Sequence, residues 1–287
     1  GTSNFRAGVN AGNSIQSGGN FNTVLGDEAG TAITTGDDNV AVGYAAGDAM
    51  TTGSYNAIVG KNSGGAITTG VENVSVGWNS LDALTEGGQN VALGASALGT
   101  DTLGSRSVAV GYQALTTQNF TTATDAHNTA VGYKAGEAVT TGANNTIIGA
   151  NTGIALTSGS NNNLIGGLAG DALTTGHSNN IMGVSCGTAL TDADYNVAIG
   201  QQALNSDTLG SQTVAIGSFA LSAQNYTTAT NSLNTAVGYA AGAAITGSAA
   251  GSGDQNTIIG GEAGDALTTG RRNSVLGVAA LSADTAG

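Results

Sequence analysis

The chain has 287 residues and contains 48 glycines, no proline, one cysteine and two histidines. Only 9% of its residues are charged and 4% are aromatic, and its net charge at pH 7 is −13. This balance disfavours a basic nucleic-acid-binding surface. Apolar residues reach 40%, which is not the composition of a disordered chain. No apolar run is long enough to insert into a membrane as a spanning helix.

A five-residue motif that ends in glycine recurs along the chain, from NTVLG at 22–26 to NSVLG at 273–277. Of the 14 spacings between the 15 pentads, 11 are 17 residues, two are 21 and one is 22. A fixed spacing of this length indicates a repeat architecture. The glycines that end the pentads, which we assign to structural turns, are Gly26, Gly43, Gly60, Gly77, Gly94, Gly111, Gly132, Gly149, Gly166, Gly183, Gly200, Gly217, Gly238, Gly260 and Gly277.

A longer repeat is superimposed on the 17-residue one. Residues 90–133 return 106 residues later as residues 196–239, and both copies carry the same four-residue insertion. We interpret this as a block duplication inside a single repeat array that covers residues 22–287. Residues 1–21 are expected to form a degenerate N-terminal coil.

The side-chain pattern within one repeat predicts a β-solenoid. Coil positions are numbered here from the first residue of each pentad. Positions 3 and 4 are both apolar, which predicts strands covered on both faces. A second stretch such as ALTTG is rich in β-formers and ends in glycine, so each coil is expected to read strand, turn, strand, turn. The sequence thus predicts an all-β parallel β-solenoid, or β-roll, of about 15–16 coils. Small coils with two apolar faces need a partner, so we expect a homotrimer.

Asparagine occupies the first pentad position in 13 of the 15 coils. Stacked amides can hydrogen-bond from coil to coil, so this column predicts a structural ladder. The exceptions, Ser107 and Thr213, each stand in the coil just before an insertion. The ladder residues are Asn22, Asn39, Asn56, Asn73, Asn90, Asn128, Asn145, Asn162, Asn179, Asn196, Asn234, Asn256 and Asn273.

The pentad followed by two residues and an alanine resembles the head repeats of YadA-like trimeric autotransporter adhesins. The 17-residue form, as in NTAVGYKAGEAVTTG at 128–142, also resembles repeats of bacteriophage tail fibres. The resemblance covers residues 22–287 and implies a left-handed parallel β-roll in an intertwined homotrimer. The adhesin repeat is shorter, with 14 residues, and no coiled-coil stalk or membrane barrel follows residue 277. We therefore expect a virion appendage or secreted fibre more than an autotransporter.

Residues for catalysis or metal binding are scarce. His127 and His177 are expected in surface turns, and Cys186 fills a position held elsewhere by alanine, which is typical of a packed thiol. No nucleophile elbow, phosphate-binding loop or zinc spacing is present. The segments 166–171 and 260–265 miss the glycine and aspartate order of calcium-binding repeats. We therefore predict no enzyme activity, no cofactor and no metal.

Aromatic residues that break the pattern are the candidate ligand contacts. One interpretation is that they pad the trimer or clamp the widened coils; the other is that they stack on a sugar or contact a receptor. The Gly/Ser-rich segment 247–255 is expected to form a flexible loop. The aromatic candidates are Tyr44, Trp78, Tyr112, Tyr133 and Tyr239 after the pentad glycine, and Phe120 and Tyr226 in the insertions.

The expected function is that of an extracellular structural fibre on a virion: a stiff shaft or head of a phage tail fibre that mediates or supports host attachment. The alternative is a bacterial cell-surface adhesin of the trimeric autotransporter type. Expected partners are further copies of the chain, a host surface glycan or receptor, and other fibre or baseplate proteins. Ice binding through threonine rows and polysaccharide depolymerisation are weaker alternatives, because the rows are interrupted and the acids show no fixed pairing.

Overall fold

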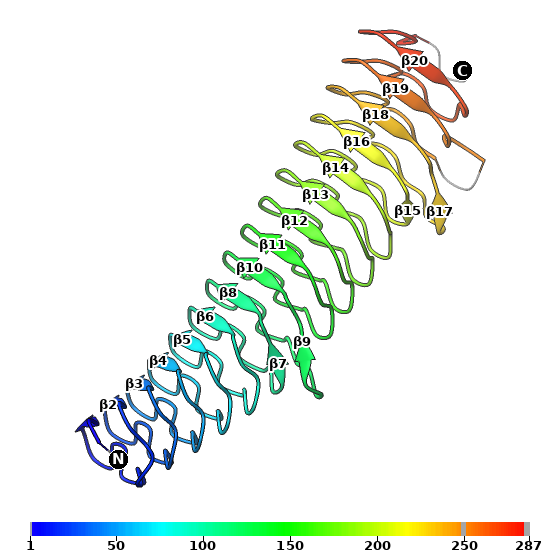
Figure 1. Cartoon of the computed structure of the whole chain (residues 1–287). Coiled ribbons are helices and arrows are strands. Elements are labelled where there is room, and N and C mark those ends of the chain that lie inside the picture. Colours follow the sequence, from blue (N-terminus) through cyan, green and yellow to red (C-terminus); the bar gives the residue numbers. More distant parts are fainter. Residues whose placement is uncertain (1, 248–250, 284–287) are drawn as a thin grey trace. The chain divides into compact units, whose positions relative to one another are not determined.

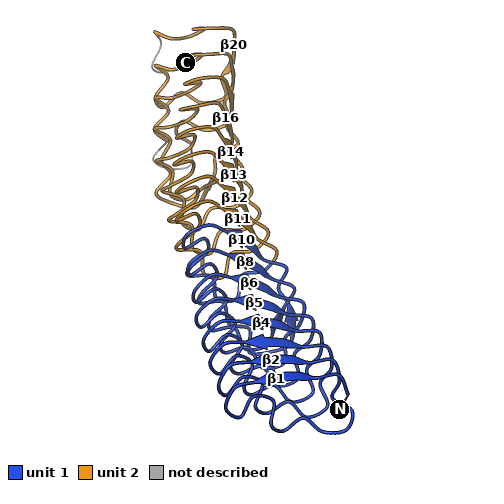
Figure 2. Cartoon of the chain, turned by 90° about the vertical axis from the view of Figure 1, so that its left-hand side faces the viewer, with its two compact units in different colours: residues 1–143 blue, residues 144–287 orange. Residues whose placement is uncertain are grey.

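The computed structural model describes residues 2–247 and 251–283, which form two compact units, residues 1–143 and residues 144–287 (Figure 2). Within the described residues every regular element is a β-strand, and no helix is present that could cross a membrane. Residues 248–250, inside the predicted loop 247–255, lie outside the described part of the chain.

The first unit is a stack of three-residue strands, one per coil, each hydrogen-bonded in parallel to the next (Figure 1). The register advances by one repeat at each step, so that Val40 pairs with Ala57 and Ala57 with Val74. The strands of this stack are β1 (Phe5–Ala7), β2 (Thr23–Leu25), β3 (Val40–Val42), β4 (Ala57–Val59), β5 (Val74–Val76), β6 (Val91–Leu93), β8 (Val108–Val110) and β10 (Thr129–Val131).

The second unit repeats this arrangement with eight further stacked strands, and the two units together give about 16 turns. The predicted all-β parallel β-solenoid with 17-residue repeats is therefore confirmed. The strands of the second stack are β11 (Thr146–Ile148), β12 (Asn163–Ile165), β13 (Asn180–Met182), β14 (Val197–Ile199), β16 (Val214–Ile216), β18 (Thr235–Val237), β19 (Thr257–Ile259) and β20 (Ser274–Leu276).

The insertions add a short second pair of strands to each copy of the duplicated block. In the first unit β7 (Gly104–Ser105) pairs in parallel with β9 (Thr124–Asp125). In the second unit β15 (Gly210–Ser211) pairs in the same way with β17 (Thr230–Asn231).

The second strand predicted in every coil is otherwise wrong. The threonine-rich stretch of an ordinary coil contacts the next coil through isolated backbone hydrogen bonds, such as Thr34 N to Thr51 O at 2.9 Å, and forms no strand. The physical reason is the tight closure of the coil: the backbone turns again at position 17, where Tyr55 has a φ of 62°. A left-handed residue ends the extended conformation that a strand requires.

The core of an ordinary coil is narrow and is filled from positions 3, 8 and 12; in the four coils at the insertions, position 12 is instead the buried polar residue Asp101, Gln118, Asp207 or Gln224. Position 3 of the strand points inward, as at Ala41 and Ile58, and meets the small residue at position 8 and the aliphatic residue at position 12. Ala46 and Met50 fill these positions in the third coil, and all four side chains are fully buried. The pentad position 4, on the other strand face, points outward.

Candidate functional site

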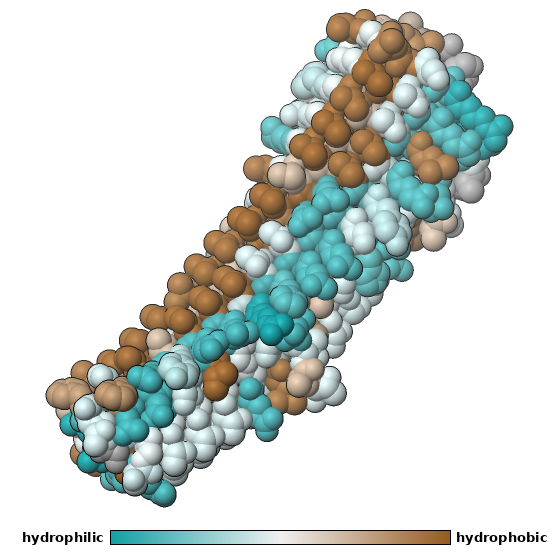
Figure 3. Space-filling view, viewed as in Figure 1, coloured by the Kyte–Doolittle hydropathy of each residue, from teal (hydrophilic) through white to brown (hydrophobic). Residues whose placement is uncertain are grey.

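The outward strand face forms a continuous apolar surface in each unit. Val76 and Leu93 in the first unit are 40% and 36% exposed, and Met182 and Ile259 in the second are 40% and 41% exposed. Figure 3 shows brown, hydrophobic rows along the surface of the stacked coils. The sequence predicted that both faces of the strand are covered; within one chain, only the inner face is. An ordered apolar surface of this kind usually marks an interaction site.

A row of half-exposed aromatic rings borders this apolar face, at position 6 directly after the pentad glycine. Exposure ranges from 47% for Tyr112 to 57% for Tyr239. Tyr112 and Tyr133 stack with centroids 5.6 Å apart and planes at 13°, and Phe219 contacts Tyr239 edge to face at 6.0 Å. The five predicted position-6 rings are therefore accessible on the single chain: Tyr44, Trp78, Tyr112, Tyr133 and Tyr239.

The two insertion aromatics are placed differently. Phe120 is only 7% exposed, and Tyr226 is fully buried with its hydroxyl donating to the carbonyl of Ser252 at 3.1 Å. Burial raises the pKa of Tyr226 above its ordinary range. Neither ring offers a face to a ligand, so the expected sugar contact is corrected for these two residues: they fill the widened coil from inside.

A groove lies beside Tyr44 in the first unit, with a volume of about 540 Å³. Position 10 on three successive coils is occupied by Asp48, Gly65 and Asp82, and all three line the groove. A Cβ atom built on Gly65 would lie 2.9 Å from Oδ1 of Asp82 and 3.6 Å from Oδ1 of Asp48. The missing side chain thus leaves both carboxylates facing one space.

The two carboxylates of this groove favour ligands that carry hydrogen-bond donors or a positive charge. Burial raises the pKa of Asp48, and burial together with the Asp48 charge raises the pKa of Asp82. Nζ of Lys61 lies 5.7 Å from the centroid of the Tyr44 ring. The sequence showed no fixed pairing of acids, because residues 34 positions apart meet here only through the stacking of coils.

The asparagines of the pentads form an amide ladder inside each unit. Nδ2 of Asn39 donates to Oδ1 of Asn22 at 3.0 Å and to the carbonyl of Gly53 at 2.9 Å. The same Oδ1 of Asn22 also accepts the backbone N–H of Asn39 at 3.0 Å. Each amide therefore joins two coils and closes its own coil, which is a structural task for a fully buried polar group.

A buried polar cluster replaces the ladder at the first insertion. Ser107 stands at the ladder position, and Gln118 supplies the missing amide: its Nε2 donates to Oγ of Ser107 at 3.1 Å, and its Oε1 accepts from Nδ2 of Asn128 at 2.9 Å. The carboxylate of Asp101 accepts from Nε2 of Gln118 and from the backbone N–H of Gly104 and of Phe120.

The second insertion carries the same cluster with Asp207, Gln224 and Thr213 in these places, and Asn234 donates to Oε1 of Gln224 at 2.8 Å. Sequence reasoning missed the aspartates and glutamines of both clusters. The signal was present, because the segments DTLGS and QN recur in both copies of the duplicated block.

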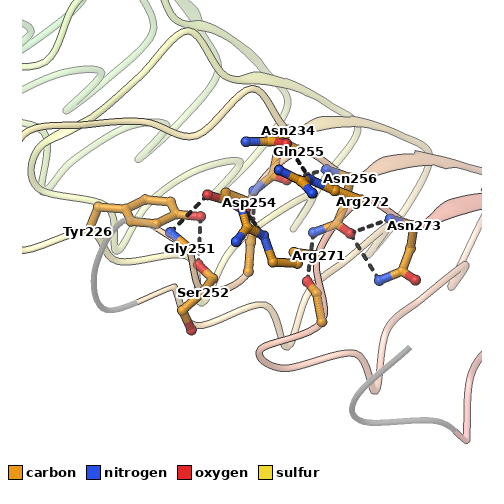
Figure 4. A network of polar contacts seen from close by, with 12 residues as sticks. Tyr226, Asn234, Gly251, Ser252, Asp254, Gln255, Asn256, Arg271, Arg272 and Asn273 are labelled. Atoms are coloured by element: carbon orange, nitrogen blue, oxygen red, sulfur yellow. Dashed lines mark hydrogen bonds and ion pairs between the residues drawn. The ribbon is translucent and has the colours of Figure 1, made fainter.

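An ion pair holds the coil that follows the second insertion (Figure 4). Asp254 is 4% exposed; its Oδ2 accepts the backbone N–H of Gly251 at 2.9 Å, and Nε of Arg271 lies 2.9 Å from its Oδ1. The ladder continues beside this pair, since Nδ2 of Asn234 donates to the carbonyl of Gly253. This network ties the insertion to the regular coils after it.

The cysteine, the two histidines and the acidic residues do not form a catalytic or metal-binding group within the described part of the chain. Burial raises the pKa of the Cys186 thiol to about 12, so at neutral pH it is not a nucleophile. His127 is exposed, and Nδ1 of His177 accepts the backbone N–H of Ser160 at 3.0 Å. Among the described residues no group of three or more His, Cys, Asp or Glu side chains is arranged to hold a metal ion.

Comparisons of the chain with protein-family models, with curated proteins and with solved structures found no match.

Proposed function

We propose that this chain is the structural protein of an extracellular fibre: a stiff homotrimeric shaft or head of a phage tail fibre or other virion appendage that supports host attachment. The observation that carries the proposal is the apolar outer face of the strands. In ordinary folds such a face is buried against another layer, and the described coils supply no second layer. Further copies of the same chain would cover it without an additional protein.

The composition and the polar interior support the same function. A chain in which only 9% of the residues are charged can pack closely against a neighbouring copy, while its net charge of −13 keeps finished fibres apart. The buried amide ladder holds each coil to the next and gives the stiffness a spacer needs. The resemblance of the repeats to phage-fibre and YadA-like head repeats points to attachment as the purpose of that stiffness.

The test is the mass of the chain in solution, measured by multi-angle light scattering. One chain has a mass of 27.6 kDa, and we expect about three times that value. The double variant Val76→Lys/Leu93→Lys places charge on the apolar face and should lower the mass. The double variant Thr52→Lys/Thr69→Lys, at exposed threonines of the coil, should leave it unchanged. A wild-type mass near 27.6 kDa would refute the trimer.

The alternative location is a bacterial cell surface, where the same trimer would serve as the head of an adhesin. Antibodies against the purified chain distinguish the two by electron microscopy. Decoration of virion appendages supports the fibre, and decoration of the outer surface of cells supports the adhesin.

A further inference from the structure

We propose that the groove beside Tyr44 is a glycan-binding site that takes neutral or positively charged sugars and excludes anionic ones. This inference deepens the attachment function proposed above and rests on it. Its basis is the combination, in one unit, of an open groove, exposed aromatic rings and a lining whose charged groups are two carboxylates; Lys61 lies against the Tyr44 ring but does not line the groove.

The shape of the groove fits part of an oligosaccharide. Its volume of about 540 Å³ is in the range of small-ligand sites. The space exists because Gly65 lacks a side chain between Asp48 and Asp82. Most other coils carry a larger residue at the same position, for example Thr31 and Thr116. Gly99 is a second glycine there, but its neighbours at this position are Asp82 and Thr116, so only Gly65 is flanked by two carboxylates.

The chemistry of the lining matches sugar hydroxyls or amines. The carboxylates of Asp48 and Asp82 accept hydrogen bonds, and Asn62 adds an amide that can both donate and accept. Sugar hydroxyls are donors, and an ammonium group would also relieve the repulsion between the two carboxylates. An anionic glycan would meet two negative charges here and a chain with a net charge of −13.

The aromatic rings supply the apolar contact that sugars need. Tyr44 lines the groove, and Trp78 stands at the same corner two coils further on, about 9.6 Å away at the usual strand spacing of about 4.8 Å. Both rings are 54% exposed. This separation is comparable to the length of two pyranose rings in an extended chain, so one glycan can contact both aromatic rings.

Trp78 is the chain's single tryptophan, and its fluorescence therefore reports on a sugar that extends from the groove to this coil corner. The probes are three oligosaccharides: chitohexaose, which is neutral, its deacetylated glucosamine hexamer, which is cationic, and a heparin hexasaccharide, which is anionic. We expect the first two to change the Trp78 emission saturably, the cationic one with the higher affinity. Equal binding of heparin, or no saturable change with any probe, would overturn the proposal.

The decisive variant is Gly65→Thr, which fills the groove with a residue that other coils accept at this position. It should weaken binding by about tenfold or more. Its matched control is Ala243→Thr, the same coil position in the second unit, which should bind as the wild type does. Asp48→Asn/Asp82→Asn should selectively remove the preference for the cationic hexamer. Unchanged affinity in Gly65→Thr would place the glycan elsewhere.

Two further measurements separate this inference from the fibre proposal. Acrylamide should quench Trp78 in the free protein; a shielded tryptophan would mean that a second copy covers the corner and would overturn the glycan site. Light scattering on the same samples gives the mass. A trimer that binds none of the sugars refutes only the groove, whereas a sugar-binding monomer refutes only the trimer.

Discussion

Gln118 takes the place of a ladder asparagine for Asn128: its Oε1 accepts from Nδ2 of Asn128 at 2.9 Å, as Asn22 accepts from Asn39 in an ordinary coil. Gln118 stands at position 12 of its coil, which ordinary coils fill with a buried apolar residue such as Met50 or Ile67, so the substitute amide comes from the core and not from the ladder position. The chain thus keeps its buried amides hydrogen-bonded where the 17-residue spacing fails.

Replacement of Gln118 by methionine tests this role. The change keeps the approximate volume but removes the donor to the Asp101 carboxylate and the acceptor for Asn128. Three buried polar groups, those of Asp101, Ser107 and Asn128, lose a partner, so we expect a loss of about 2–4 kcal/mol in unfolding free energy. Urea unfolding followed by circular dichroism measures it. The exposed control Gln201→Met should stay within about 0.5 kcal/mol of wild type; an equal loss in both variants contradicts the role.

The asparagine ladder predicts how strongly different substitutions of Asn73 should destabilise the fold. Its Nδ2 donates to Oδ1 of Asn56 at 3.1 Å and to the carbonyl of Gly87 at 3.0 Å, and its Oδ1 accepts the N–H of Asn90. Threonine, which the chain uses at position 213, should cost less than alanine, and aspartate should cost most because its oxygens would face two acceptors.

The same urea experiment on Asn73→Thr, Asn73→Ala and Asn73→Asp checks this order. Alanine should cost about 1–3 kcal/mol. If aspartate is tolerated as well as threonine at pH 7, the amide is not acting as a donor and the ladder is misassigned.

Replacement by alanine should lower the stability of the fold at a pentad glycine but not at an unhindered glycine outside the pentads. Gly60 has a φ of +135°, and a Cβ atom there would lie 2.4 Å from the carbonyl oxygen of Gly77 in the next coil. Gly261 has no atom within 4 Å of such a Cβ. We expect Gly60→Ala to cost about 3 kcal/mol or more through strain and steric clash, and Gly261→Ala to be nearly neutral. Thermal melts of both variants decide; a neutral Gly60→Ala would contradict the close backbone stacking.

How far the sequence could predict this molecule depends on what each feature requires. The strands and the asparagine column follow from position-specific residue types that repeat every 17 residues. The left-handed corners do not follow from residue type. Leu98 and Tyr55 have φ values of 49° and 62°, which side chains such as theirs disfavour, because closure of the coil imposes this conformation. The groove was likewise beyond prediction, since Asp48 and Asp82 meet only across a missing side chain.

The buried carboxylate of Asp207 predicts a pH dependence of stability. Burial raises its pKa in the folded protein, although hydrogen bonds from Gln224 and the backbone oppose the shift. The folded state then holds the proton more tightly than the unfolded state, so the contribution of Asp207 to stability grows as the pH falls from neutral through its folded pKa. It is fully present below the unfolded value near 3.8.

The comparison is between wild type and Asp207→Asn, which cannot ionise at this position. The unfolding free energy of the wild type relative to the variant should increase between pH 7 and pH 4, measured by urea titration at each pH. A difference that stays constant, or that shrinks toward low pH, would contradict a raised pKa in the folded state.

A buried trio of hydroxyls gives a test in which three substitutions should cost less than one. Oγ of Ser75 lies 2.8 Å from Oγ of Ser63 and 2.6 Å from Oγ of Ser80, at positions that most coils fill with alanine or larger apolar residues. Ser75→Ala alone leaves two buried hydroxyls with fewer partners and should cost about 1 kcal/mol.

The triple variant to alanine removes every group that needs a partner and restores the residue types of a common coil. We expect its urea midpoint to lie at or above that of the single variant, with the exposed Ser158→Ala as a neutral control. Additive losses across the three serines would instead mean that each hydroxyl stabilises the coil independently of the others.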